Sequence, residues 1–488
     1  MSVNRLGKGL EALIRPEAEQ KKKPAKKPTI AKPGVTEIPL KEIRPNPNQP
    51  RRDFDESALD ELAASIKEKG ILTPVTVREV EDGYELVAGE RRWRASKKCR
   101  KRTIPAYLIA VKDDAEMMEM ALIDDEGNMA EWITFLEDEE LTMTFDLPEG
   151  SERPLVSINR DFTAPVRIKR ALSRDDQLAM IRLETDPFNQ WDSVQNLAKQ
   201  EILALSEGSQ AEPDDALVEA MAVAIRGAVD DPAFASLLTR LPDVGELFQE
   251  RQPADPVALN TARKKLQAAL YSKLSDFVDD ILAKSSPEPY DPGAEQAGER
   301  ALRTALINLL AASGHDEAGE RLLGLYNAAT NMTEKLAALR GLAGLEGAAR
   351  ETALADFERT WKSNPLVMDK WFGVQAGTGD AATVSKLAAH PDFDMGNPNR
   401  VRSVAAAFAM QNLSGFHAPD GSGYEVIEGI ILKADKVNPA LGARLLTAFE
   451  QWRILEPKAK AEAEACLRRL QAADLSKNSA DIVSRALS

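Results

Sequence analysis

From about residue 173 to residue 488 the sequence repeats one pattern, in which Ala and Leu recur every three or four residues and Pro or Gly interrupts the run. This spacing puts the apolar side chains on one face of a helix, so it predicts successive helices of about 12–18 residues joined by short loops. Each such helix must cover its apolar stripe with a neighbour. We therefore predict paired, stacked helices like those of an α-solenoid, although no strict repeat period is visible.

The sequence before this helical run has a different pattern. Short alternating apolar runs and turn residues predict a compact α/β unit, with a strand at 37–40, a helix from 53 to a C-cap at Gly70, a β-hairpin of 74–78 with 84–88, a helix from 89 to 95 and a strand at 104–109. Residues 111–135 fit neither pattern. Residues 137–168, including LTMTFDL and APVRI, alternate apolar and polar side chains, which predicts two or three antiparallel strands.

Charge divides the chain in the same way. Residues 1–110 carry 24 Lys and Arg against 16 Asp and Glu, a net charge of +8, whereas the whole chain has a net charge of −15. Residues 111–488 therefore carry −23, so we expect anionic ligands for the basic part alone. The sequence contains no apolar run long enough to predict a transmembrane helix. Its two cysteines, Cys99 and Cys466, lie far apart in sequence, which indicates a reducing, cytoplasmic setting.

The stretch Gly89-Glu90-Arg91-Arg92-Trp93-Arg94-Ala95 directly follows the predicted strand YELVA. A glycine at such a turn lets backbone N–H groups approach an anion, and a helix N-terminus adds its dipole and unpaired donors. Arginine guanidinium groups add donors that suit phosphate. The stretch therefore fits a phosphate site, and a solvated basic helix start fits it as well.

Four segments of this part resemble the N-terminal domain of ParB, the chromosome-partitioning protein: LGKGLEALI (6–14), NPNQPRRDFD (46–55), LAASIKEKGILTPVTVR (62–78) and YELVAGERRWRAS (84–96). The resemblance implies a fold that binds CTP with a magnesium ion. It assigns nucleotide contact to Gly70, Thr73, Pro74, Gly89, Glu90, Arg91, Arg92 and Arg94. It also implies a ParA-type ATPase as partner, contacted by Arg5 and Lys8.

The resemblance breaks after Ile123. The family continues with Glu-Asn-x-x-Arg, which helps to hold metal and nucleotide, whereas this chain has Asp124-Asp125-Glu126-Gly127-Asn128. Asp124 is a candidate magnesium ligand in place of the glutamate, and a solvated loop is the alternative. Weak CTP hydrolysis stays open. No recognition helix follows, so we expect DNA binding that is at most non-specific, through the Lys-rich residues 16–35.

The remainder resembles the C-terminal end of the bacterial alanyl aminopeptidase, aminopeptidase N. The resemblance rests on RPLVSINRDFTAPVRI (153–168), ETDPFNQWDSVQNLA (184–198), NMTEKLAALRGLA (331–343), NPLVMDKWFGVQA (364–376), NPNRVRSVAAAFAMQNLSGFHAPDGSGYE (397–425) and LEPKAKAEAEACLRRL (455–470). It implies the end of a β-sandwich, followed by the helical domain that restricts access to the catalytic domain.

Peptidase chemistry in that family needs zinc held by an HExxH helix, and this chain has no such motif. Its three histidines, His315, His390 and His417, lie far apart in sequence, so we expect no zinc site. His417 is interpreted as a hydrogen-bonded loop histidine. Arg400 and Arg402 are interpreted as structural ion-pair residues, with the lining of a former peptide channel as the alternative. Trp191, Trp361 and Trp371 are interpreted as core residues.

The predicted fold is multidomain, α/β followed by all-α. It has a ParA-contact segment and flexible basic linker (1–35), a ParB-like nucleotide-binding domain related to sulfiredoxin (36–123, the head), a junction (124–136), a β-sandwich remnant (137–170) and a solenoid-like helical domain (171–488, the body). The predicted function is a CTP-binding module fused to a non-catalytic helical domain. The alternatives are an inactive aminopeptidase relative and a fusion remnant without selected function. The predicted location is the cytoplasm, and association with the nucleoid stays open. The oligomeric state stays open.

Overall fold

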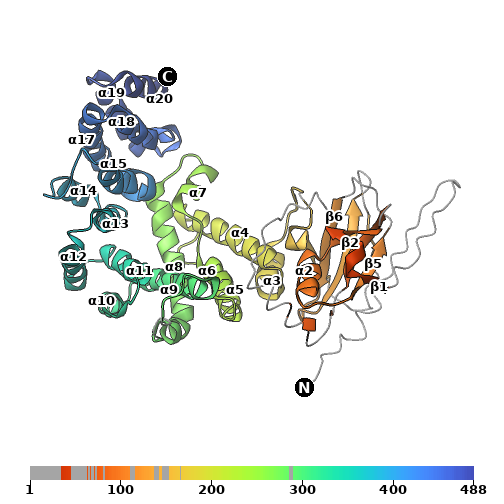
Figure 1. The fold of residues 1–488 in the computed structure, drawn as a ribbon. Helices are drawn as coiled ribbons and strands as arrows, with labels where there is room; N and C mark the ends of the chain where they lie inside the picture. The colour runs from red at the N-terminus through yellow and green to blue at the C-terminus, as the bar shows by residue number, and fades with distance from the viewer. Residues whose placement is uncertain are drawn as a thin grey trace. The chain divides into compact units, whose positions relative to one another are not determined.

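A computed structural model describes residues 35–45, 63, 66–67, 71, 74–80, 83–109, 116–136, 142–144, 153–164, 166–284 and 289–488 (Figure 1). The chain forms two compact units. The first comprises residues 1–171 and 183–189, and the second comprises residues 172–182 and 190–488. An α/β region with sheets thus precedes a large all-helical region, which confirms the predicted fold class.

A five-stranded sheet forms the centre of the head. Its strands are β1 (Val35–Pro39), β2 (Ile43–Pro45), β3 (Val75–Val80), β4 (Gly83–Ala88) and β5 (Thr103–Ile109), with the 3₁₀-helix η2 (Leu40–Glu42) between β1 and β2. The strand order is β1-β5-β3-β4-β2. β1 pairs antiparallel with β5, β3 antiparallel with β4, and the β3–β5 and β2–β4 pairs are parallel. One face carries α2 (Glu90–Lys98), which directly follows β4.

The predicted hairpin and the helix after it are confirmed. β3 and β4 pair with Val77 opposite Leu86, and both side chains are fully buried. Apolar residues from β1, β3, β4 and β5 pack against Trp93 of α2: Ile38, Val75, Val77, Leu86, Ile104 and Ala106. The alternating pattern of the sequence therefore buries one side of the sheet under the helix. Of the predicted helix at 53–70, only Ala63, Ile66 and Lys67 lie inside the described residues, and all three are helical.

A second sheet follows. It has the order β7-β6-β8, with β6 (Glu116–Ile123) in the centre, β7 (Met129–Leu136) joined to it by a hairpin, and β8 (Leu155–Ile158) antiparallel on its other side. Two of these strands lie in residues 111–135, which the sequence pattern left unassigned. The prediction of two or three strands within 137–168 is wrong for the described part of that range, which contains β8 alone; Thr142–Thr144 and Val166–Ile168 are not strands.

A tight loop carries the chain out of β8. Asn159, Asp161 and Phe162 all have positive φ, near 55°, at and within the 3₁₀-helix η3 (Arg160–Phe162). The Asn159 side chain holds this loop, because its Oδ1 accepts from the Ala164 N–H at 2.7 Å and its Nδ2 donates to the Ala164 carbonyl at 3.0 Å. Arg160 is buried and pairs with the buried Glu184 at 3.2 Å, which ties the loop to residues 184–189 of the same unit.

The second unit consists of helices. In chain order they are α3 (Arg174–Leu183), α4 (Pro187–Ser206), α5 (Asp215–Gly227), α6 (Pro232–Thr239), α7 (Val244–Glu250), α8 (Pro256–Leu282), α9 (Ala294–Ala312), α10 (Ala318–Ala328), α11 (Met332–Ala343), α12 (Ala348–Trp361), α13 (Pro365–Ala376), α14 (Ala381–Ala388), α15 (Pro398–Val401), the π-helix η4 (Arg402–Gln411), α16 (Leu413–Phe416), α17 (Ser422–Val437), α18 (Pro439–Leu446), η5 (Thr447–Phe449), η6 (Trp452–Ile454), α19 (Pro457–Ala472) and α20 (Lys477–Leu487).

Several of these helices start in the same way, with an Asp or Asn N-cap followed by proline. Asp231, Asp255, Asn364, Asn397 and Asn438 each precede a proline, and each side chain accepts hydrogen bonds from N–H groups of the first turn. The cap satisfies donors that the helix leaves unpaired, and the proline ring already has a helical φ. The Pro-punctuated pattern of the sequence thus fixes where these helices begin.

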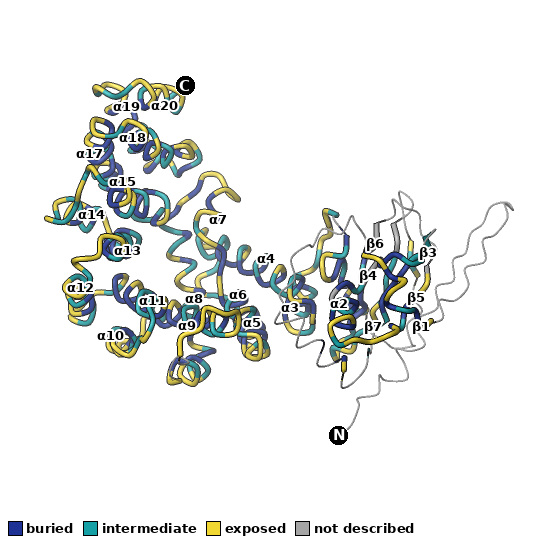
Figure 2. The backbone as a smooth tube through the Cα atoms, in the orientation of Figure 1, coloured by how far each residue is buried: buried dark blue, intermediate teal, exposed yellow. Residues whose placement is uncertain are grey.

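The helices bury a continuous apolar core, dark blue on their inner faces in Figure 2. Trp371 is buried in it, and Trp191 and Trp361 are partly buried against it, which confirms the predicted core role of all three. Figure 1 shows α11, α13 and α15 in one row of this unit and α10, α12 and α14 in a second row. None of the helices that the structure describes combines the length and apolar character needed to cross a membrane.

Candidate functional site

The turn between β4 and α2 has the backbone conformation that the sequence predicts for a phosphate-binding turn. Gly89 is the N-cap of α2, with φ 92° and ψ 31°, in the left-handed region. A Cβ atom at this position would lie 2.9 Å from Cγ1 of Val75 on the neighbouring strand. Only glycine fits here without strain, and no side-chain cap covers the first N–H groups of α2. The helix N-terminus is thus left with donors for an anion.

The structure joins this turn to the second predicted pocket segment. The NH1 group of Arg92 donates to the backbone carbonyl of Pro74 at 2.8 Å, across 18 residues of sequence. Pro74 directly precedes β3, and Gly89 directly follows β4, its hairpin partner. Two nucleotide-contact segments that the resemblance implied, around Pro74 and Gly89, therefore meet at one end of the sheet.

Glu90 and Arg94 form an ion pair one helical turn apart. Arg94 Nε donates to Glu90 Oε1 at 2.8 Å, and the Glu90 side chain is 8% exposed. The second carboxylate oxygen, Glu90 Oε2, is buried and has no hydrogen-bond partner among the described residues. A buried carboxylate oxygen without a donor is costly, so this atom is a place where a bound N–H group or a cation would be stabilised.

The rest of α2 fixes the orientation of the helix. Trp93 is buried in the head core, and the Lys97 ammonium lies 3.6 Å from the centre of its ring. Burial lowers the pKa of Lys97, and the nearby Glu90 partly opposes that change. The Ser96 hydroxyl is buried and donates to the Arg92 carbonyl at 2.7 Å. These contacts keep the polar start of α2 facing the turn while its apolar face stays on the sheet.

Sequence reasoning missed one charged cluster in the head. Glu85 on β4 is buried and pairs with Arg78, which lies opposite it in the hairpin, at 2.6 Å, and with Arg44 on β2 at 3.3 Å. The hairpin register itself is the signal that would have found the Arg78–Glu85 pair, because opposite charges on facing positions of two strands stabilise each other. The cluster links β2, β3 and β4.

Several predicted site residues lie outside the described residues: Arg5, Lys8, Gly70 and Thr73. Arg91 lies in α2, but its side chain also falls outside them. Asp124 lies in the β6–β7 turn. Its Oδ1 accepts from the N–H groups of Glu126 and Asn128 at 3.0 and 2.8 Å, and its Oδ2 accepts from the Asn128 side chain at 2.9 Å. The carboxylate thus closes the turn, and its magnesium role stays a prediction.

The fold brings one histidine near two carboxylates. Ligand atoms of Glu358, His390 and Asp392 lie within 4.8 Å of one another. His390 Nδ1 accepts from the Asp392 N–H at 3.1 Å, and His390 Nε2 lies 3.4 Å from Glu358 Oε1. The Nδ1 lone pair is thus engaged by a backbone N–H, and Nε2 faces a carboxylate. We interpret the three residues as a hydrogen-bonded group.

The other two histidines have simpler settings. His315 is exposed. His417 is buried, and its Nδ1 lies 2.8 Å from the Tyr424 hydroxyl. Burial lowers the pKa of His417 to about 3, so the ring is neutral at physiological pH. The prediction of a hydrogen-bonded loop histidine is confirmed.

Arg400 is buried and has the structural role that the sequence predicted. Its Nε donates to Asp369 Oδ1 at 2.6 Å, and its guanidinium lies 4.4 Å from the centre of the Phe372 ring. Arg402, two residues later, is exposed and donates to the Pro398 carbonyl and the Asn399 side chain. The two arginines therefore differ: one holds the core together, and the other faces solvent.

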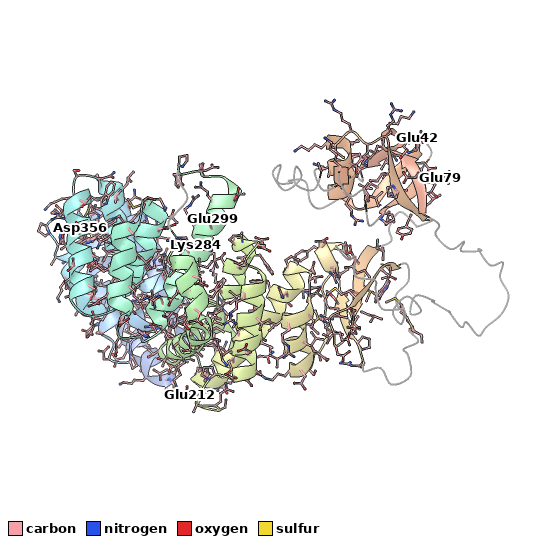
Figure 3. All side chains as sticks on the ribbon, turned by 90° about the horizontal axis from the view of Figure 1, so that it is seen from below. Glu42, Glu79, Glu212, Lys284, Glu299 and Asp356 are labelled. Atoms are coloured by element: carbon pink, nitrogen blue, oxygen red, sulfur yellow. The ribbon has the colours of Figure 1, made fainter. Side chains whose placement is uncertain are left out.

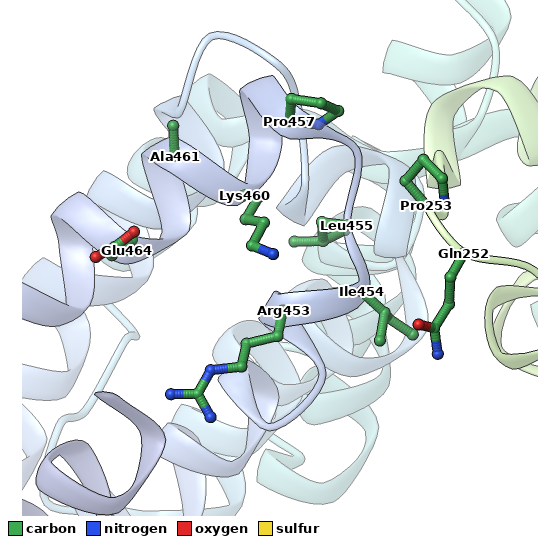
Figure 4. Close-up of a pocket in the computed structure, with 9 residues that line it drawn as sticks. All are labelled: Gln252, Pro253, Arg453, Ile454, Leu455, Pro457, Lys460, Ala461 and Glu464. Atoms are coloured by element: carbon green, nitrogen blue, oxygen red, sulfur yellow. The ribbon is translucent and has the colours of Figure 1, made fainter. Parts of the chain in front are cut away.

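The second unit also contains a hollow of about 630 Å³ between the segment at Gln252 and the start of α19. Figure 4 shows Arg453 and Lys460 pointing into it from η6 and α19, with Leu455 and Pro253 on its apolar side. Its wall is held by the backbone, since Ala254 N–H donates to the Ile454 carbonyl at 2.7 Å and Glu456 N–H donates to the Ala254 carbonyl at 2.9 Å. Glu464 also lines this hollow, and its carboxylate pairs with Arg468.

Comparison with known proteins assigns the two ends of the chain to two different families. A family described as a domain of unknown function with ARM repeats, DUF3458_C, matches residues 174–488, and the ParB N-terminal domain family matches residues 24–126. Aminopeptidase N of Caulobacter vibrioides is 36% identical over 365 residues, which cover 73% of this chain and 42% of that protein. The chromosome-partitioning protein Spo0J of Thermus thermophilus is 48% identical over 122 residues, 25% of this chain and 39% of that protein.

Two matches to solved structures cover different shares of the chain. Legionella pneumophila aminopeptidase A in complex with aspartic acid matches with a TM-score of 0.64 and 25% identity, over 78% of this chain and 46% of that one. The C-terminally truncated ParB of Caulobacter crescentus, complexed with CTP-gamma-S, is 43% identical over 16% of this chain and 46% of that one, with a TM-score of 0.16. The chain thus spans less than half the length of each of these relatives.

Proposed function

The chain belongs to the DUF3458_C family of ARM-repeat domains, the C-terminal domain of aminopeptidase N, and carries a ParB N-terminal domain fused in front of it; from this premise we propose that the protein is a CTP-binding module attached to a helical scaffold. One observation carries the proposal. The left-handed Gly89 exposes the start of α2 beside Pro74, which Arg92 holds in place at 2.8 Å.

The chemistry of this turn suits a triphosphate. The uncapped N–H groups of α2 and the guanidinium groups of Arg91, Arg92 and Arg94 are donors of the kind that phosphate oxygens accept. The unpartnered Oε2 of Glu90 supports a cation or a ligand N–H at the same place. Magnesium would come with the nucleotide, because it is commonly bound through phosphates and few protein carboxylates. Asp124 is the proposed protein ligand, and Gly70 and Thr73 are proposed to complete the pocket.

The similarity to the ParB N-terminal domain also supports proposals on cellular location and partners. We propose a cytoplasmic location and a ParA-type ATPase as partner of the segment containing Arg5 and Lys8. DNA contact is proposed to be non-specific, through the Lys-rich residues 16–35, and to weaken steeply with salt. The body supplies no zinc motif of its own, so we assign it a scaffold role.

The test is calorimetric titration of CTP with magnesium into the full chain, with ATP as the nucleotide control. We expect CTP binding that Arg91→Ala abolishes and Arg102→Ala keeps. Arg102 is exposed in the segment between α2 and β5, and its replacement removes the same charge. If the wild-type chain binds neither nucleotide, the proposal fails. The altered segment at Asp124–Asn128 would then have disabled the site, and the chain would be a fusion remnant.

A further inference from the structure

A second hollow of about 630 Å³ lies in the helical unit, between α11, α13 and η4. Small residues line it: Gly373 of α13, Gly377 at the C-cap of that helix, and Ala406 and Ala407 of η4. A Cβ atom on Gly373 would lie 3.4 Å from the Ser403 carbonyl oxygen, so α13 and η4 approach backbone to backbone. Small residues therefore line the hollow where the two helices meet.

The unusual helix η4 sets one wall of the hollow. Residues Arg402–Gln411 form a π-helix, whose hydrogen bonds run from residue i to residue i+5. In such a helix, residues four to five positions apart share a face, and Arg402, Ala406, Ala407 and Gln411 all line the hollow. An α-helix would instead turn Ala405 and Ala409, which are buried in the core, toward that side. The π-helical geometry thus brings polar Gln411 and exposed Arg402 to the same wall of the hollow.

Three cationic side chains line the hollow. Arg340 comes from α11, Lys370 from α13 and Arg402 from η4. Within the part of the chain that the structure describes, none of the three has a carboxylate partner, and Arg402 is held by an amide and a carbonyl oxygen. The one carboxylate lining the hollow, Asp369, is already paired with Arg400 at 2.6 Å.

This arrangement contrasts with its surroundings. Residues 111–488 carry a net charge of −23, and Figure 3 shows the labelled Glu212 and Glu299 on the outside of the helical unit. Other arginines of the unit pair with acids, as Arg303 does with Glu334 at 3.1 Å. Like charges gathered around one hollow repel one another, and a negatively charged ligand would remove that cost.

We propose that this hollow binds a short acidic peptide segment through its carboxylates. Stacked helical repeats commonly present a concave surface to an extended ligand, and the volume lies in the range of ordinary ligand sites. Arginine guanidinium groups match carboxylates with two hydrogen bonds each. A long polyanion such as nucleic acid is disfavoured, because the net charge of −23 on residues 111–488 would repel it. This proposal does not depend on nucleotide binding by the head.

The test is fluorescence polarisation of a labelled glutamate-rich peptide with the full chain, at low and at high salt. We expect binding that salt weakens and that the Lys370→Gln/Arg402→Gln variant weakens by about tenfold for each cation removed. The matched control is Arg453→Gln/Lys460→Gln in the hollow of Figure 4, which removes the same charge from a site of the same volume and should change Kd by less than about twofold.

Further arms keep the result unambiguous. The peptide is used with a free and with an amidated C-terminus. The amidated form has only side-chain carboxylates, so comparing the two forms shows whether the terminal carboxylate is the group that binds. Binding of either form supports the site. A glutamine-substituted peptide should not bind. Arg340→Gln alone, at an exposed position, serves if the double variant melts early. Equal binding by wild type and the Lys370→Gln/Arg402→Gln variant, or an equal loss in the control variant, would overturn the proposal.

Discussion

The guanidinium of Arg92 and the backbone carbonyl of Pro74 lie 2.8 Å apart, so a residue of α2 holds the residue that precedes β3. Arginine is therefore both a charge and a tether at this position. Removing it would release the segment before β3 and would also lower the positive potential at the start of α2.

We expect Arg92→Ala to weaken CTP binding by at least about tenfold, which is the loss expected for one charge-assisted hydrogen bond. Amide hydrogen exchange around Val75 should become faster in the same variant, since the tether is gone. Arg92→Lys keeps the charge but not the planar group, so it should recover only part of the affinity. Unchanged exchange and unchanged affinity in Arg92→Ala would contradict the tether.

Gly89→Ala should destabilise the first unit by about 1–3 kcal/mol, because an L-residue there is strained at φ 92° and its Cβ would press on Val75. Thermal unfolding followed by hydrogen exchange in the head measures the effect. Gly429→Ala is the control, since a Cβ there meets open space within α17 and alanine favours a helix. If Gly89→Ala and Gly429→Ala shift stability equally, the turn is not under the constraint described.

Arg400→Ala should cost about 3–5 kcal/mol of the free energy of unfolding, because it leaves the Asp369 carboxylate without its buried partner. Arg402→Ala, two residues away and exposed, should change that free energy by no more than about 0.5 kcal/mol. Urea denaturation of the two variants side by side measures both values. The structural interpretation of Arg400 is rejected if the two variants unfold alike.

His417 should make the helical unit sensitive to mild acid. Its pKa in the folded protein is about 3, below the usual 6.5, so between these values the unfolded chain binds a proton that the folded chain excludes. The contribution of His417 to the free energy of unfolding is therefore fully present above pH 6.5. It decreases by roughly 1.4 kcal/mol for each pH unit as the pH drops from 6.5 toward 3. Urea denaturation at pH 7.5 and pH 5 should show a smaller pH dependence in His417→Gln than in wild type, while His315→Gln, at an exposed histidine, keeps the wild-type dependence.

The chain should not hydrolyse a chromogenic alanyl substrate, with or without added zinc. It has no HExxH motif, and where the described residues group a histidine with two carboxylates, at His390, the ring Nδ1 accepts a hydrogen bond from the Asp392 N–H. Measurable release of the chromophore by purified protein, lost in His390→Gln, would show that this reasoning is wrong.

Local patterns predicted those parts of the fold whose partners lie nearby in sequence. The β3–β4 hairpin and α2 followed from alternation, a turn and one glycine, and the helices followed from the spacing of Ala and Leu and from the Pro and Gly residues that interrupt it. The strand β6 could not be predicted, because EMMEMALI has no clear period of its own and becomes a strand by pairing with β7 and with Leu155–Ile158 of β8. The unpartnered Oε2 of Glu90 and the cations that line the hollow beside η4 could not be predicted for the same reason, because both depend on packing between segments that are distant in sequence.

The central position of β6 has a practical consequence for dividing the protein. The ParB N-terminal domain family extends to residue 126, yet β6, at Glu116–Ile123, forms the middle of a sheet whose outer strands come from later residues. A truncation that begins after residue 123 would remove the only strand that β7 and β8 share among the described residues, and each would be left with an open edge. A fragment that contains the helical part should therefore start before Glu116, so that β6 is kept. A fragment of the head that lacks β7 and β8 should be tested for solubility.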